Sequence, residues 1–172
     1  MNVLPATRPA TLAEIARRSD SLEAFGRHFR DWLHEVAKWS SRKQAVCAVA
    51  QAPRPLATRF SQGKIADAWL AAYAEFICEK CGQTTPEWTF SSDRFLAETE
   101  PWFSVPRENS RARLLTLRDT PAAFKRRNLF TAVVELPLRF RAGRPRKTLA
   151  EKRHVNALRQ KRFRLRQKRQ NK

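Results

Sequence analysis

Glycine is scarce in this chain, with four residues in 172. All-β proteins and doubly wound α/β proteins need glycine repeatedly in their turns, and their strands are rich in β-branched apolar runs. Such runs are also nearly absent here. The composition therefore predicts a mainly α fold, in which five Trp and eleven Phe supply ample apolar surface for one compact helical core.

Cysteine is also scarce. Cys47, Cys78 and Cys81 are odd in number and too few for a disulfide framework, which favours free thiols in a reducing cytoplasm. Cys78 and Cys81 have the spacing of half a zinc knuckle, but tetrahedral zinc needs two more ligands. His28 and His34 do not form a ligand pair with each other or with Cys47. We therefore expect neither a metal nor another cofactor.

Long hydrophobic runs are missing. The longest apolar stretch, residues 68–74, is bounded by Asp67 and Glu75, and residues 1–9 contain no apolar stretch after a basic start. These features predict neither a membrane span nor a secretion signal. No Ser/His/Asp arrangement, glycine-rich phosphate loop or His-Glu metal motif occurs either. We expect a protein that is not an enzyme.

Two long amphipathic helices are predicted by apolar positions that recur every three or four residues. The first begins after Ser21, and the second covers residues 64–81 and stops at Gly82. The two prolines within residues 51–55 predict a connection between these helices. The apolar stripe of the first helix is Leu22, Phe25, Phe29, Leu33, Val36 and Trp39, and that of the second is Ile65, Trp69, Ala72 and Phe76.

Three shorter helices are also expected. Thr11 and Glu14 have capping-box spacing at the start of a helix that should end near residue 19. A further helix should cover residues 110–117. Thr120 followed by Pro121 resembles an N-cap and first helical residue, which predicts a helix from there towards residue 128.

The remaining parts of the body have no sustained period. Residues 83–106 mix proline with aromatic side chains, which predicts an irregular segment wrapped on the core. In residues 130–140 the alternation of apolar residues is too short to distinguish the edge of a strand pair from a loop.

Acidic residues are almost absent from the C-terminal part. Residues 139–172 hold fifteen Lys/Arg and one acid, Glu151, and so carry +14 of the formal net charge of +19. Residues 1–138 hold the other 20 cations and 15 acids and are nearly neutral. This asymmetry predicts two parts: a helical body, residues 1–138, which is a protein-interaction module, and a basic tail, residues 139–172, which binds nucleic acid.

The start of the tail resembles an AT-hook, whose core is Gly-Arg-Pro between basic residues. Pro fixes an extended backbone, and Gly allows that backbone to approach the groove floor closely. The narrow minor groove of A-tracts is strongly negative and favours inserted Arg. The resemblance assigns to this groove the hook residues Arg141, Gly143, Arg144, Pro145 and Arg146.

Residues 148–172 contain no Pro or Gly and are rich in helix-forming residues. Their apolar residues form no coherent stripe, so we expect a segment that is disordered or partly helical alone and becomes ordered on a phosphate backbone. A solvated charge run is the alternative, and RNA would offer similar phosphate contacts. The predicted phosphate-binding residues are Lys147, Arg153, Arg159, Lys161, Arg162, Arg164 and Arg166.

Residues from about 60 to 130 resemble antitoxin-like regulators that accompany nucleotidyltransferase-fold toxins in bacteria. The matching pieces are Ala-Ala-Tyr-Ala-Glu at 71–75, Pro-Glu-Trp at 86–88, Glu-Pro-Trp-Phe at 100–103 and Thr-Pro-Ala-Ala-Phe-Lys-Arg-Arg-Asn-Leu-Phe at 120–130. The resemblance implies a helical module that binds the toxin and a DNA-binding element that represses its own operon. Such proteins often carry an N-terminal helix-turn-helix, which residues 1–60 do not show, so DNA contact would have moved to the tail.

The resemblance also implies a bacterial cytoplasmic location, compatible with association with the nucleoid. The candidate partner-binding residues are Trp88, Trp102, Phe103 and Phe124, for which the alternative is a role in the core. Together these features predict a non-catalytic DNA-binding protein that is antitoxin-like or a transcriptional regulator. Two alternatives are an RNA-binding or ribosome-associated protein, and a nucleic-acid-acting toxin or enzyme with an unrecognised catalytic centre.

Overall fold

The computed structural model describes residues 8–131 and 133–138. All of them belong to one compact unit. The described residues are mainly helical, which confirms the predicted fold class. In chain order the elements are α1 (Leu12–Arg18), α2 (Leu22–Val36), α3 (Arg42–Ala50), α4 (Gly63–Cys81), the 3-10 helices η1 (Glu87–Phe90) and η2 (Ser92–Arg94), β1 (Trp102–Phe103), α5 (Ser110–Asp119), α6 (Ala122–Lys125) and β2 (Leu129–Phe130).

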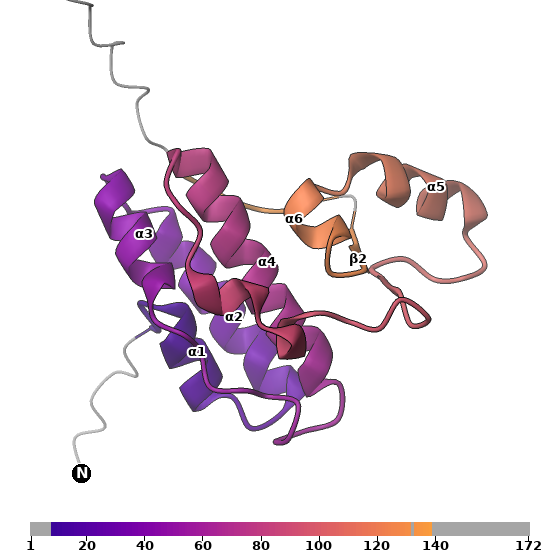
Figure 1. Ribbon diagram of the computed structural model, residues 1–172, viewed down its shortest axis with the longest axis horizontal. Coiled ribbons are helices and arrows are strands. Elements are labelled where there is room, and N and C mark those ends of the chain that lie inside the picture. The colour runs from indigo at the N-terminus through magenta and orange to yellow at the C-terminus, as the bar shows by residue number, and fades with distance from the viewer. Residues whose placement is uncertain (1–7, 132, 139–172) are drawn as a thin grey trace, which may run out of the picture. The chain divides into compact units, whose positions relative to one another are not determined.

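Helix α4 is the centre of the unit. Figure 1 shows α1, α2 and α3 on one side of α4, and α5, α6 and β2 on the other. Because neighbours cover α4 on several sides, it is buried almost all round, from Ala66 through Leu70 and Tyr73 to Ile77. The predicted apolar positions all pack on the core, with Ala72 fully buried and Ile65, Trp69 and Phe76 partly buried, but burial extends well beyond them.

The C-terminus of α4 ends where the sequence predicts. Gly82 has φ +64°, a left-handed conformation that costs glycine little, and its successor Gln83 donates its backbone N–H to the Cys78 carbonyl at 2.9 Å.

Helix α2 buries most of the predicted stripe, but it also buries Trp32, which the stripe did not include, and it leaves Leu22 outside. Phe25, Phe29, Trp32 and Val36 are buried, whereas Leu22 is 44% exposed. These four positions lie one helical turn apart and place the large Trp32 ring inside the core. Trp39 lies beyond the end of the helix and packs edge-on against Trp32, with 5.8 Å between ring centroids.

Side-chain caps begin the first three helices. Thr11 Oγ1 accepts the Glu14 backbone N–H at 3.1 Å, as its spacing predicts, although the Glu14 carboxylate reaches the backbone of Ala10 instead of Thr11. Helix α3 was not predicted. Its start is nevertheless encoded locally, because Ser41 and Gln44 form a complete capping box.

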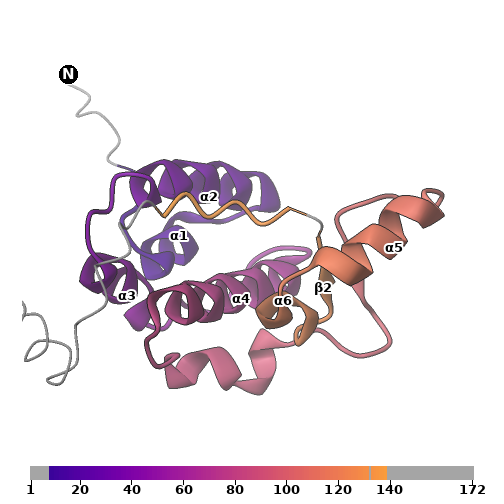
Figure 2. The same ribbon diagram turned by 90° about the horizontal axis from the view of Figure 1, so that it is seen from above.

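Residues 83–106 are largely irregular, as expected, with two short 3-10 helices. The parallel pairing of β1 with β2 was not predicted; it aligns Trp102 with Leu129 and Phe103 with Phe130. Beyond β2, residues 133–138 form no strand and run back towards the helices around α4 (Figure 2). The Tyr73 hydroxyl holds this segment by donating to the Glu135 carbonyl at 3.2 Å.

Thr120 has a different role from the one predicted. It is the C-cap of α5, whereas α6 begins after Pro121 without a side-chain cap. The Thr120 hydroxyl lies 2.5 and 2.9 Å from the Thr116 and Thr131 carbonyls and accepts the Thr131 backbone N–H at 2.8 Å. The hydroxyl therefore joins α5 to the chain after β2, a contact eleven positions away that local spacing does not reveal.

Candidate functional site

The predicted nucleic-acid contacts lie outside the described residues. They are Arg141, Gly143, Arg144, Pro145, Arg146, Lys147, Arg153, Arg159, Lys161, Arg162, Arg164 and Arg166. Their roles stay predictions, and the candidate surfaces of the body are built from the described residues.

Phe124 is a core residue, which corrects its interpretation as a partner contact. Its side chain has no exposed surface. Its ring meets Trp69, Tyr73 and Phe76 of α4 edge-on, with centroid distances of 5.3, 5.2 and 6.0 Å. Edge-to-face contacts of this kind stabilise a packed interior, so Phe124 anchors α6 on α4.

The other three predicted partner contacts are partly buried and already have partners within the chain. Trp88 donates its indole N–H to the Val49 carbonyl at 3.1 Å, which ties η1 to α3. Trp102 lies edge-on to Trp69 at 5.4 Å. Phe103 stacks on Phe130 at 4.8 Å. Their partner-binding role stays a prediction.

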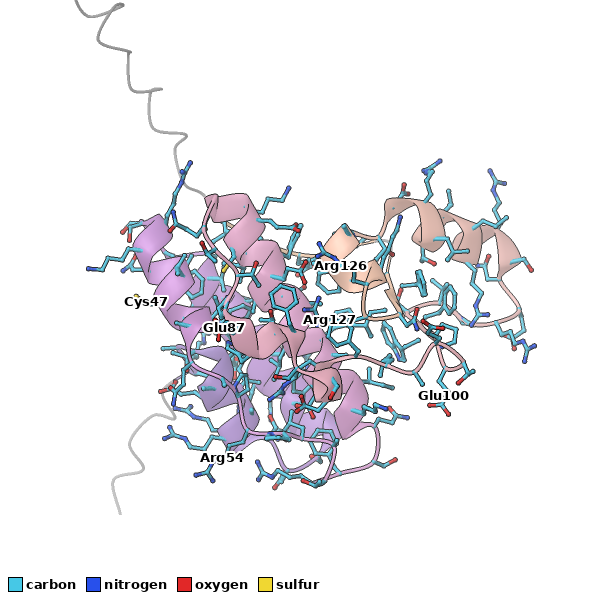
Figure 3. The ribbon with its side chains drawn as sticks, viewed as in Figure 1. Cys47, Arg54, Glu87, Glu100, Arg126 and Arg127 are labelled. Atoms are coloured by element: carbon cyan, nitrogen blue, oxygen red, sulfur yellow. The ribbon has the colours of Figure 1, made fainter. Side chains whose placement is uncertain are left out.

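A buried ion pair joins α4 to the chain after α6. Glu75 and Arg127 are 2% and 0% exposed, and an Arg127 Nη1–H donates to Glu75 Oε2. Arg126, whose side chain is 52% exposed, lies 2.6 Å from Glu75 Oε1. Figure 3 labels Arg126 and Arg127 between α4 and α6. Arg127 also donates to the carbonyls of Ala123 and Thr89, so most of its hydrogen-bonding capacity is used. Burial lowers the pKa of Arg127, and the bond to Glu75 opposes that shift.

A second buried ion pair joins the N-terminal part of α4 to η2 and to the connection that precedes α4. Asp67 Oδ1 accepts from Arg94 at 2.7 Å, and Oδ2 accepts the backbone N–H groups of Leu56 and Ala57 at 2.8 and 2.9 Å. Arg94 also donates to the Pro53 carbonyl at 2.6 Å. Burial raises the pKa of the Asp67 carboxyl above its usual value, against the effect of its hydrogen bonds.

Both pairs are structural, and the sequence analysis did not identify them. Asp67 and Glu75 were seen only as the ends of an apolar run. Acids that adjoin an apolar run on a central helix are the signal that could have predicted buried ion pairs, because a buried carboxylate needs a cation as its partner. The sequence does not show which of the 20 cations of the body supplies it.

Three of the exposed large apolar side chains in the described part of the chain lie on α5. Leu114, Leu115 and Leu117 are 67, 41 and 41% exposed, and Thr116 is the one buried residue of α5. Arg111 and Arg118 stand one turn before and one turn after Leu114 and are also exposed. We call these five residues, Arg111, Leu114, Leu115, Leu117 and Arg118, the α5 face.

A polar pocket of about 310 Å³ lies between α1 and the connection after α3. Glu14, Arg17 and Arg54 line it together with Thr11, Ala13, Gln51 and Ala52. Glu14 already caps the backbone at Ala10, and its carboxylate lies 3.9 Å from Arg17. The pocket combines charges of both signs without a buried polar group directed into it, which gives no preference for a ligand class.

The three cysteines are free thiols. Cys47 is exposed, whereas Cys78 and Cys81 are buried at the end of α4. Burial raises the pKa of Cys78 to about 11. Within residues 8–131 and 133–138, no cluster of three or more His, Cys, Asp or Glu side chains is arranged to hold a metal ion.

None of the helices in the described part of the chain is long and apolar enough to cross a membrane. The chain matches no known family model, no curated protein and no solved structure.

Proposed function

We propose that this chain is a non-catalytic DNA-binding protein, an antitoxin-like or transcriptional regulatory component that binds a protein partner through its body and A·T-rich DNA through its tail. One observation carries the DNA-binding part. Residues 139–172 place fifteen cations beside one acid, directly around a Gly-Arg-Pro core. Such a segment repels itself unless a polyanion offsets its charge.

The structure of the body is compatible with separate roles for the body and the tail. Its core lies within residues 12–138, and its buried carboxylates Asp67 and Glu75 are already neutralised by internal arginines. The body therefore has a self-sufficient interior, and the tail is the main source of unneutralised charge. A nucleotidyltransferase-like toxin is the protein partner suggested by the sequence resemblance.

Fluorescence anisotropy tests the DNA-binding part. Full-length protein and a 1–138 truncation are titrated with A·T-rich duplex, G·C-rich duplex and structured RNA at several salt concentrations. We expect binding that needs the tail, prefers A·T-rich duplex and has a slope of log K against log salt of about −5 to −7, which corresponds to six to eight phosphate contacts. Circular dichroism of the truncation confirms that the body is still folded.

Two results contradict the proposal. Equal affinity for both duplexes would contradict the AT-hook assignment, and preference for RNA would favour the RNA-binding alternative.

Growth assays address the protein partner. Rescue of cells from a nucleotidyltransferase-like toxin by residues 1–138 supports the antitoxin role, whereas growth inhibition by the same fragment favours a toxin or enzyme.

A further inference from the structure

Three leucines within four positions of α5 face solvent. A single exposed leucine is ordinary on a protein surface, but Leu114, Leu115 and Leu117 are all exposed within four positions of a helix of ten residues. A local concentration of exposed apolar side chains often marks an interaction site, because covering them removes apolar area from water.

The leucines cannot reach the core by rotation of α5, because its inner side is anchored. Thr116 is buried, and the following Thr120 is bonded to the backbone of Thr131. The Arg113 guanidinium lies 4.1 Å from the centre of the Phe103 ring. These contacts attach α5 to the β1–β2 pair and fix the outward direction of the leucines.

The charge around these leucines is mainly positive. Arg111 and Arg118 lie in line with Leu114 along the helix, because positions i, i+3 and i+7 share one side. Arg107 precedes the helix, and Lys125 Nζ donates to the Arg118 carbonyl at its other end. The acids of this region are Glu108 and Asp119. Asp119 accepts hydrogen bonds from Nε and Nη2 of Arg118 at 2.7 and 3.0 Å, which partly offsets the charge of Arg118 and leaves Arg111 as the main cation beside Leu114.

We propose that the α5 face binds an acidic amphipathic helix of a protein partner. Apolar side chains spaced by three or four residues on that helix cover Leu114, Leu115 and Leu117, while its carboxylates meet Arg111 and Arg118. Helices commonly bind through such apolar anchors, and arginine is enriched in protein interfaces. This inference rests on the protein-binding part of the proposed function and specifies its location and chemistry.

Charge and geometry favour this occupant over others. A second copy of α5 would place like charges opposite each other, which opposes association. An interfacial membrane helix separates its apolar and cationic faces, whereas Leu114 lies between two arginines on one side. A partner that combines carboxylates with apolar side chains complements both properties of the α5 face.

A peptide panel tests the inference on the full-length protein. Three fluorescent 18-residue helical peptides share one leucine stripe and carry Glu, Gln or Lys at their other positions. Anisotropy in 0.3 M NaCl reduces non-specific attraction by the basic tail. We expect the Glu peptide to bind at least tenfold more tightly than the Gln peptide, and the Lys peptide to bind most weakly.

Two double variants locate the binding. Leu114→Asp with Leu117→Asp should weaken binding of the Glu peptide at least tenfold. Arg111→Glu with Arg118→Glu should lower the preference for Glu over Lys peptide at least tenfold. Leu22→Asp is the matched control, because Leu22 is 44% exposed on α2, and it should change neither value. Circular dichroism of every variant shows whether the helices are retained.

Peptide binding that neither double variant changes overturns the inference, as does an absence of preference for the Glu peptide. Partition of the wild type, but not of the leucine variant, onto phosphatidylserine vesicles without Glu-peptide binding also overturns it and identifies a lipid surface. A·T-rich duplex is titrated in parallel. Retained DNA binding with a failed peptide test rejects only the α5 site, whereas lost DNA selectivity rejects the proposed function.

Discussion

Arg127 and Glu75 lie 52 positions apart in the sequence and form an ion pair in which both side chains are buried. The pair attaches the chain after α6 to the central helix α4. Because a buried charge without a partner is strongly unfavourable, either residue alone would destabilise the fold.

Glu75→Gln should lower the free energy of unfolding by about 3–5 kcal/mol, since it leaves the Arg127 guanidinium buried without a counter-charge. Urea denaturation followed by circular dichroism measures the change. Glu79→Gln is the control on the same helix: the Glu79 side chain is 43% exposed and lies 3.3 Å from Arg126, so its loss should cost at most about 1 kcal/mol. Equal effects of the two substitutions would show that the buried pair adds nothing.

Gly63→Ala should destabilise the protein by about 1–3 kcal/mol or more. A Cβ at position 63 would lie 2.0 Å from the Leu56 carbonyl oxygen, and a backbone atom cannot move aside easily. Gly26→Ala is the matched control, because a Cβ there meets nothing within 4 Å and alanine favours the helix by about 0.5–1 kcal/mol. Thermal melts of both variants should shift in opposite directions; a parallel shift would contradict the close approach at Leu56.

One thiol should react quickly in the folded protein and three in the unfolded protein. Cys47 is exposed, whereas Cys78 and Cys81 are buried. Titration with a thiol reagent near pH 8, with and without denaturant, measures these numbers. Fast reaction of all three thiols without denaturant would place Cys78 and Cys81 outside the core.

Stability should decrease as the pH rises from about 9 to about 11. Burial raises the pKa of Cys78 from 9.0 to about 11, so the unfolded state loses its proton first and is favoured over this interval. Cys78→Ala removes this contribution and should reduce the slope, while Cys81 and Tyr73, whose pKa values burial also raises, keep part of it. Urea midpoints of both proteins between pH 8 and 11 provide the measurement, and identical slopes would contradict the assignment.

Arg144→Ala should weaken binding to A·T-rich duplex by about 1–3 kcal/mol and to G·C-rich duplex by less, because it removes a groove-inserted side chain. Lys168→Ala is the control: it removes a tail cation outside the hook and should weaken both complexes equally.

The double variant Arg162→Ala with Arg164→Ala should reduce the magnitude of the slope of log K against log salt by about two on either duplex, because it removes two phosphate contacts. Equal losses from Arg144→Ala on both duplexes would contradict the hook, and an unchanged slope would place Arg162 and Arg164 away from phosphates.

Local features of the sequence were sufficient to predict where α1 begins and where α4 ends. The capping residue Thr11 and the left-handed Gly82 act within a few positions of the chain, and both lie where they were expected. Helix α3 was missed although Ser41 and Gln44 signal its start, because its short sequence lacks a clear apolar stripe. The α5 face was also missed: the helix was expected, but its leucines do not reveal by themselves which side is covered.

By itself, the sequence determined that the body is mainly helical and that the positive charge is concentrated after residue 138, because helix signals and composition act locally. Only the tertiary structure decided the partners of Asp67 and Glu75, the burial of Phe124 and the exposure of Leu114. These properties depend on which distant segments pack against α4 and on which sides remain uncovered. Packing between segments tens of residues apart has no local signature, and therefore the candidate surface became visible only in the folded chain.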